Sequence, residues 1–141
     1  MRHLLDTDEL SLLERGGTDS FILQRRLETV SASDLATTIV TYEEQMRGWL
    51  SRIAVANTPE KILTSYNRLQ IHVETFRGIP VVPFDTSALK IFERLQKSHR
   101  RLGTMDLKIA AIAIANDALL LSRNLAHFSQ IPDLRVEDWS R

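Results

Sequence analysis

The chain has 141 residues, which is enough for one domain with a sizeable hydrophobic core. Hydrophobic residues make up 43% of it and charged residues 26%, the balance of an ordinary globular domain. Basic and acidic residues both number 18, so the zero net charge gives no support for general nucleic-acid binding, and the lack of cysteine excludes disulfides and thiolate metal sites.

No segment of the sequence has the pattern of a membrane anchor or a leader. The longest purely apolar run, 109–115, is far shorter than the roughly 18 residues that a membrane-spanning helix needs. The N-terminal segment reaches an acid at Asp6, so it lacks the apolar core of a signal peptide. We therefore expect a cytoplasmic protein that forms a single domain over residues 1–141.

In the first half of the chain, short apolar runs alternate with helical segments. Leu4-Leu5 predicts a first strand, and the apolar spacing over 8–15 predicts a helix that two glycines end. Residues 21–30 are expected to be helical. The β-branched run 35–40 predicts a second strand, and a helix is expected to follow over 42–54.

The second half continues this alternation. Thr58-Pro59 begins a predicted helix that ends at Gly78, and His72 lies on its apolar face, where we expect a hydrogen-bonded core residue. Residues 106–117 predict a helix that is apolar nearly all round and therefore deeply buried. The other predicted elements are a short strand at 79–83, a helix at 85–101, a strand at 119–122 and a short edge strand at 134–139.

The order of these elements predicts an α/β fold with a mostly parallel β-sheet flanked by helices on both faces. Ligands of such sheets bind outside the carboxyl ends of the strands. Three acids lie at the ends of apolar segments: Asp6 after the first strand, Glu44 shortly after the second, and Asp106 at the start of the buried helix. Converging carboxylates bind hard divalent cations. A metal held in this way can cut a phosphodiester.

Each of these acids also has a structural explanation. Asp6 and Asp106 could cap the helices that follow them, and Thr41 with Glu44 fits a capping box. Both roles can coexist, because a helix N-terminus stabilises a carboxylate in the ionised form that a metal requires. Periodicity alone does not separate Glu44 from its neighbour Glu43. Three further acids are expected to be solvated or to cap helices: Asp8, Glu9 and Asp85.

Other kinds of site find little support. The four histidines do not have zinc-site spacing, and the chain contains neither a Gly-x-Ser-x-Gly nucleophile motif nor a glycine-rich phosphate loop. A basic stretch precedes Asp106, and it is either a solvated helix face or a contact for a phosphate backbone. Its residues that are expected to make such a contact are Lys97, Arg100 and Arg101.

Four segments together resemble the PIN-domain ribonucleases, specifically the VapC-type toxins of prokaryotic toxin–antitoxin pairs. Residues 4–8 resemble the family's first strand and first acid, although Asp8 stands where the family more often has Asn. The pattern Thr41-x-x-Glu44-x-x-x-Gly48 resembles its second motif, and this resemblance favours Glu44 over Glu43. Residues 103–111 resemble the third-acid motif, and 122–139 resemble the family's C-terminal end.

The resemblance implies a divalent-metal-dependent endoribonuclease that cleaves structured RNA, with tRNA as the favoured class. Asp6, Glu44 and Asp106 would hold Mg²⁺ or Mn²⁺, partly through water, while Asn124 would orient a metal-bound water. Thr7 and Ser122 would support these carboxylates. The resemblance also implies a cognate antitoxin that blocks the site, and a homodimer.

One departure from the family pattern affects the mechanism. Many relatives have a fourth acid in the stretch that matches 122–128, and here Asn124 and His127 are the only candidates to replace it. Fewer carboxylates favour one bound metal over two. The alternative is a nuclease-dead PIN-like module that binds RNA or a protein. A more remote alternative is a metal-independent α/β protein with an apolar small-molecule pocket.

Overall fold

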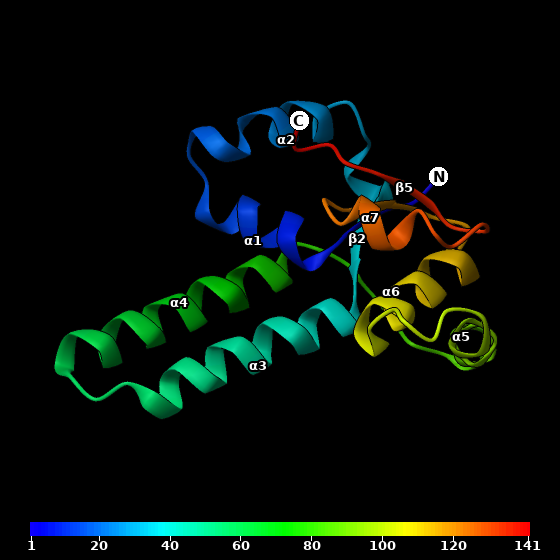
Figure 1. The fold of residues 1–141 in the computed structure, drawn as a ribbon. Coiled ribbons are helices and arrows are strands. Elements are labelled where there is room, and N and C mark those ends of the chain that lie inside the picture. Colours follow the sequence, from blue (N-terminus) through cyan, green and yellow to red (C-terminus); the bar gives the residue numbers. More distant parts are fainter.

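The computed structural model describes residues 1–141, and its centre is a five-stranded sheet in which every strand pair is parallel (Figure 1). The predicted fold class is therefore confirmed. The strands lie in the order β3-β2-β1-β4-β5. Their bounds are β1 His3–Leu5, β2 Leu35–Thr38, β3 Val81–Val82, β4 Leu119–Leu121 and β5 Arg135–Glu137.

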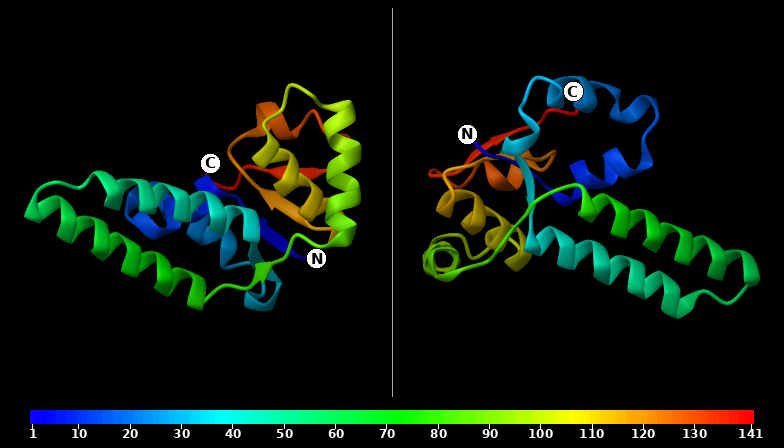
Figure 2. Two further views of the ribbon diagram at one scale, coloured as in Figure 1. Left: turned by 90° about the horizontal axis from the view of Figure 1, so that it is seen from below. Right: turned by 180° about the vertical axis from the view of Figure 1, so that it is seen from behind.

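Seven α-helices surround this sheet. Two long ones, α3 (Ile39–Val55) and α4 (Pro59–Arg77), form a hairpin that extends well beyond the sheet in both views of Figure 2. None of the helices is long and apolar enough to cross a membrane. The other five are α1 Thr7–Arg15, α2 Phe21–Leu27, α5 Thr86–Ser98, α6 Thr104–Ala115 and α7 Leu125–Phe128, with short 3-10 turns at Thr18–Ser20 and Ala32–Asp34.

The two faces of the sheet have separate hydrophobic cores, because successive strand residues point to opposite faces. Leu4 and its partner Leu120 belong to the larger core, together with buried residues of α5 and α6. Leu5 and its partner Leu121 belong to the smaller core, which Leu10 of α1 also joins. Helices thus cover both faces, as the sequence predicts.

Helix α6 is the most deeply buried helix, and this confirms the prediction from its composition. Six of its residues are buried, and the helix packs mainly against α5. Asp106 is not its N-cap, contrary to one of the two explanations above, because Gly103 holds that position and Asp106 lies within the first turn. Its carboxylate is therefore not needed to begin the helix.

The second strand is shorter than the sequence predicts, because a cap residue ends it. The Thr38 Oγ1 accepts a hydrogen bond of 3.0 Å from the backbone N–H of Thr41, so α3 begins at Ile39. The β-branched pair Ile39-Val40 therefore lies in a helix and not in the strand. The expected capping box of Thr41 and Glu44 is also wrong, since Thr38 is the N-cap.

The strand order places a crevice beside the central strand. From β1 the chain goes to β2 and then β3 on one side, and it returns to β4 and β5 on the other side of β1. The connections after β1 and β4 therefore diverge, and in open parallel sheets such a switch point is where ligands bind. Asp6 follows β1 directly and Ser122 follows β4 directly.

Candidate functional site

Asp6 anchors the candidate site at this switch point. Its backbone N–H donates to the carbonyl oxygen of Leu121 at 3.0 Å, which continues the pairing of β1 with β4. One carboxylate oxygen accepts from the Thr7 backbone N–H at 2.8 Å and the other accepts from the Ser122 Oγ at 2.7 Å. Asp6 is thus the N-cap of α1, as the sequence suggests, and its carboxylate is fixed on both sides.

Burial raises the pKa of the Asp6 carboxyl to about 6 from 3.8, and the hydrogen bonds from Ser122 and Thr7 oppose that rise. The nearby charges of Asp8 and Asp106 add to the rise. Asp6 is only 6% exposed, and it makes no ion pair within the chain. The free energy of the ionised carboxylate therefore remains high until a cation approaches it.

Glu44 reaches the same place from α3. Its Oε1 accepts a hydrogen bond of 2.9 Å from the Thr7 Oγ1. Thr7 directly follows Asp6 in the chain, so this bond holds Glu44 next to the first acid. Burial raises the pKa of the Glu44 carboxyl, the Thr7 bond lowers it, and the charges of Asp106 and Asp8 raise it further. Glu43 instead pairs with Arg47 on the outer side of α3.

Asp106 faces the other two acids from the first turn of α6. The Asn124 Nδ2 donates to its Oδ2 at 3.4 Å, and the His127 Nδ1 lies 3.5 Å from the same oxygen. The backbone N–H of Asn124 donates to the Ser122 Oγ at 3.0 Å, which also connects this side to Asp6. Asn124 and His127 thus both lie beside the Asp106 carboxylate.

The three acids supply the oxygen ligands that a hard divalent cation prefers. The charge of Asp106 raises the energy of both the Asp6 and the Glu44 carboxylates, and no lysine or arginine pairs with any of the three acids. In the structure, no group of three or more His, Asp or Glu side chains lies close enough together to hold a metal ion. A metal bound here would consequently keep several water molecules, as Mg²⁺ does in most protein sites.

Of the two acids in the first turn of α1, Glu9 differs from the sequence-based expectation and Asp8 does not. Asp8 is exposed as expected, but its charge acts on both Asp6 and Glu44, so it belongs to the electrostatic surroundings of the site. Glu9 is fully buried with no hydrogen-bond partner, although a solvated or capping role was predicted. The sequence did contain a signal of this burial, because Glu9 lies three residues after the Asp6 cap and therefore on the same face of α1.

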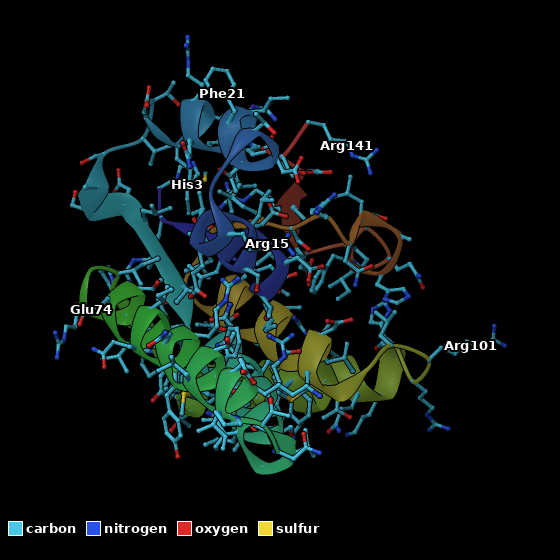
Figure 3. The ribbon with its side chains drawn as sticks, turned by 90° about the vertical axis from the view of Figure 1, so that its left-hand side faces the viewer. His3, Arg15, Phe21, Glu74, Arg101 and Arg141 are labelled. Atoms are coloured by element: carbon cyan, nitrogen blue, oxygen red, sulfur yellow. The ribbon has the colours of Figure 1, made fainter.

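The predicted RNA-contacting residues lie apart from the carboxylates. Lys97 is in the last turn of α5, and Arg100 and Arg101 follow that helix in the connection to α6. All three are exposed. Arg101 projects from the edge of the molecule in Figure 3, and the structure does not bring it into contact with the site.

His72 is buried in the core, but it is not hydrogen-bonded as predicted. Its ring stacks on Tyr42 and meets the edge of Phe76, while neither ring nitrogen has a hydrogen-bond partner. The Nδ1 lies 3.5 Å from the Glu14 carboxylate, which is also buried. This pair joins α4 to α1 and takes no part in the carboxylate site.

Known proteins resemble the chain in sequence and in fold. The PIN domain family model matches residues 4–134. Ribonuclease VapC1 of Haemophilus influenzae (strain R2866) is 26% identical over 144 residues, and the similarity covers both chains completely.

Two solved structures show the same fold. VapBC-1 from nontypeable Haemophilus influenzae has a TM-score of 0.76 and 24% identity, with all of both chains covered. VapBC2 from Rickettsia felis, solved bound to a DNA fragment from its promoter, has a TM-score of 0.74 and 20% identity, with 99% of each chain covered. The match of the family model includes β1 to β4 for the most part and all three acids, and this chain therefore belongs to the PIN domain family.

Proposed function

We propose that this protein is a divalent-metal-dependent endoribonuclease and the toxin of a VapC-type toxin–antitoxin pair. The observation that carries the proposal is that Asp6, Glu44 and Asp106 approach one another without a lysine or arginine to neutralise them. The full-length similarity to ribonuclease VapC1 supports the same activity.

The chain's own residues orient the acids. Thr7 and Ser122 donate to Glu44 and Asp6, which fixes these carboxylates while leaving oxygen lone pairs free for a ligand. Bound at this site, Mg²⁺ or Mn²⁺ would supply an acidified water and a positive charge beside the scissile phosphate. Asn124 is neutral, so it can orient a water but adds no charge, and one ion is sufficient for the site.

The substrate and partners follow from the same assignment. We propose structured RNA as the substrate, with tRNA as the favoured class, and contacts from Lys97, Arg100 and Arg101 to its phosphates. The VapBC structures of similar fold support a cognate antitoxin as a partner that blocks the carboxylates. A homodimer is part of the proposal.

Metal binding and cleavage test the proposal together. Mg²⁺ or Mn²⁺ should raise the melting temperature of the wild type, because the cation relieves repulsion among the acids. Asp6→Asn and Glu44→Gln should both lose that increase and lose cleavage of total RNA. Glu43→Gln is the matched control, since it removes the same charge one residue away and breaks only an exposed ion pair.

Two outcomes would contradict the proposal in different ways. An unchanged metal response in Asp6→Asn would show that the ion binds elsewhere. If the metal binds as expected but the antitoxin-free wild type cleaves no RNA, the chain is the nuclease-dead module that the missing fourth acid allows.

A further inference from the structure

A polar pocket lined by residues of α1, α3 and α4 lies outside the carboxylate site. Its volume is about 220 Å³. The pocket is unusual in a chain of zero net charge, because three of the six side chains around it are arginines. The lining residues are Ser11, Glu14, Arg15, Trp49, Arg52 and Arg68.

These three arginines have no anionic partner. None of them makes an ion pair or a side-chain hydrogen bond within the chain. The single acid of the pocket is Glu14, whose side chain is 7% exposed and whose carboxylate lies 3.5 Å from the His72 Nδ1. Of the eleven other arginines, five pair with a nearby carboxylate and six do not; the five are Arg47, Arg77, Arg94, Arg135 and Arg141.

Trp49 holds one of the arginines in place. The guanidinium carbon of Arg52 lies 4.6 Å from the centre of the Trp49 ring, which is a cation–π contact. A guanidinium stacked in this way keeps its N–H groups free at its edges. Trp49 is therefore a positioning residue for Arg52, and the planar fork of Arg52 suits bidentate binding of a phosphate.

The pocket is connected to the carboxylate site along two helices. Thr7 contacts Glu44, and one turn further on the Gln45 Nε2 donates to the Ser11 Oγ at 3.0 Å. Arg15 follows Thr7 by eight residues, which is about 12 Å along α1 at 1.5 Å per residue. In Figure 3, Arg15 lies centrally on the face that the hairpin also reaches, far from Arg101 at the edge.

We propose that Arg15, Arg52 and Arg68 bind backbone phosphates of the RNA, a few nucleotides from the phosphodiester that is cut at the three acids. The inference rests on the proposed function, because the anion would be part of the same substrate. The pocket gives the RNA a second point of attachment on α1 and α3, and so fixes the direction in which the strand crosses the carboxylates. An acidic segment of a partner protein is the competing ligand.

Salt-dependent RNA binding tests this subsite without any cleavage. The probe is a fluorescently labelled single-stranded RNA, measured by anisotropy in EDTA. The variant is Arg15→Gln with Arg52→Gln and Arg68→Gln, all at exposed positions. Its log-affinity against log-salt slope should be shallower by about 2, because each phosphate that is no longer neutralised reduces the slope by about 0.7.

A matched control separates the subsite from overall charge. Arg2→Gln with Arg25→Gln and Lys90→Gln removes three exposed charges that likewise make no ion pair, and its slope should stay close to that of the wild type. A local readout is the fluorescence of Trp49 in a Trp139→Phe background, where it is the only tryptophan left. RNA should change this emission in the wild-type pocket and not in the triple variant.

Each remaining outcome has one meaning. Equal slopes for the pocket variant and the control, with RNA bound by the wild type, would overturn the subsite while leaving the proposed nuclease intact. A pocket variant that binds RNA normally but no longer binds the antitoxin would also overturn it, in favour of the acidic protein segment. Failure of the wild type itself to bind RNA would instead refute the proposed function.

Discussion

At the scale of single residues, Glu9 has the least favourable environment in the chain. It is 0% exposed, and neither carboxylate oxygen has a hydrogen-bond donor. Burial raises its pKa to about 7 from 4.5, the charge of Asp138 adds to the rise, and Arg123 opposes it. The folded protein therefore keeps Glu9 protonated under conditions in which the unfolded chain has released that proton.

This difference predicts how stability depends on pH. Between pH 4.5 and about 7 the folded state binds the Glu9 proton and the unfolded state does not, so the free energy of unfolding falls as pH rises. The loss should be on the order of 3 kcal/mol, and it should level off above the folded pKa. Urea unfolding of metal-free wild type and Glu9→Gln from about pH 5 to pH 8 measures it. The variant should become the more stable protein at the alkaline end.

An exposed glutamate provides the control for this prediction. Glu93→Gln on α5 removes a carboxylate that is in contact with solvent, so its pH profile should match that of the wild type. If Glu9→Gln also follows the wild-type profile at every pH, the burial of an uncompensated carboxyl at Glu9 is contradicted.

The residues that form the candidate site differ in how well the sequence revealed them. Asp6 and Glu44 lie close to the ends of predicted strands, so the rule that strand ends converge was enough to pair them. Asn124 could be named only from the resemblance, because no spacing or periodicity in the sequence marks an asparagine that will lie next to an acid in the fold. Glu9 was missed, because packing between distant segments decides whether an acid in the first turn of a helix meets water or the core.

At the scale of elements, the start of α3 controls where Glu44 stands. Thr38 ends β2 and caps α3, and both Thr38 and Thr41 are completely buried. Glu44 lies in the second turn of that helix, so its approach to Thr7 depends on where the first turn begins. The run 35–40 was predicted to be entirely strand. Strand propensity alone does not show that a threonine such as Thr38 can accept a backbone hydrogen bond and begin a helix.

The cap should therefore contribute to both stability and metal binding. Thr38→Ala should lower the free energy of unfolding by about 1–2 kcal/mol, as for other N-cap threonines. It should also weaken the Mg²⁺-induced rise in melting temperature, because α3 can then fray toward Glu44. Chemical denaturation and thermal melts with and without Mg²⁺ measure the two effects.

Thr58→Ala is the matched comparison, since Thr58 caps α4 with a 3.2 Å bond from the Lys61 backbone N–H, far from the acids. It should cost stability without altering the metal response. A normal metal response in Thr38→Ala would show that Glu44 does not depend on this cap.

At the scale of the whole molecule, the parallel sheet was predictable and its order was not. Alternating apolar runs and helices indicate a parallel sheet in any α/β protein, but they do not say on which side of β1 each later strand lies. That choice depends on packing between distant segments, such as Leu4 with Leu120 and Leu5 with Leu121. The short helix α7 was also missed, since four residues are too few to show a helical period.

This strand order predicts the effect of a truncation. A chain that ends after Asp117 lacks β4 and β5, so it exposes one side of β1 and part of both cores. We expect it to lose cooperative unfolding and to aggregate, because an open edge of a parallel sheet with buried leucines pairs with other chains. Removal of Ser140 and Arg141 alone should leave cooperative unfolding intact. Circular dichroism and urea titration distinguish the two cases, and a cooperative transition in the shorter chain would contradict the role of β4.

The distance along the chain between the two halves of the site also matters while the protein is being made. Asp6 is among the first residues to leave the ribosome, whereas Ser122, which holds it, is separated from it by 116 positions. Translation proceeds from the N-terminus, and the central strand must wait for β4 before the crevice closes. An unfinished chain therefore contains its first acid without the Ser122 hydrogen bond that fixes the Asp6 carboxylate in the finished protein.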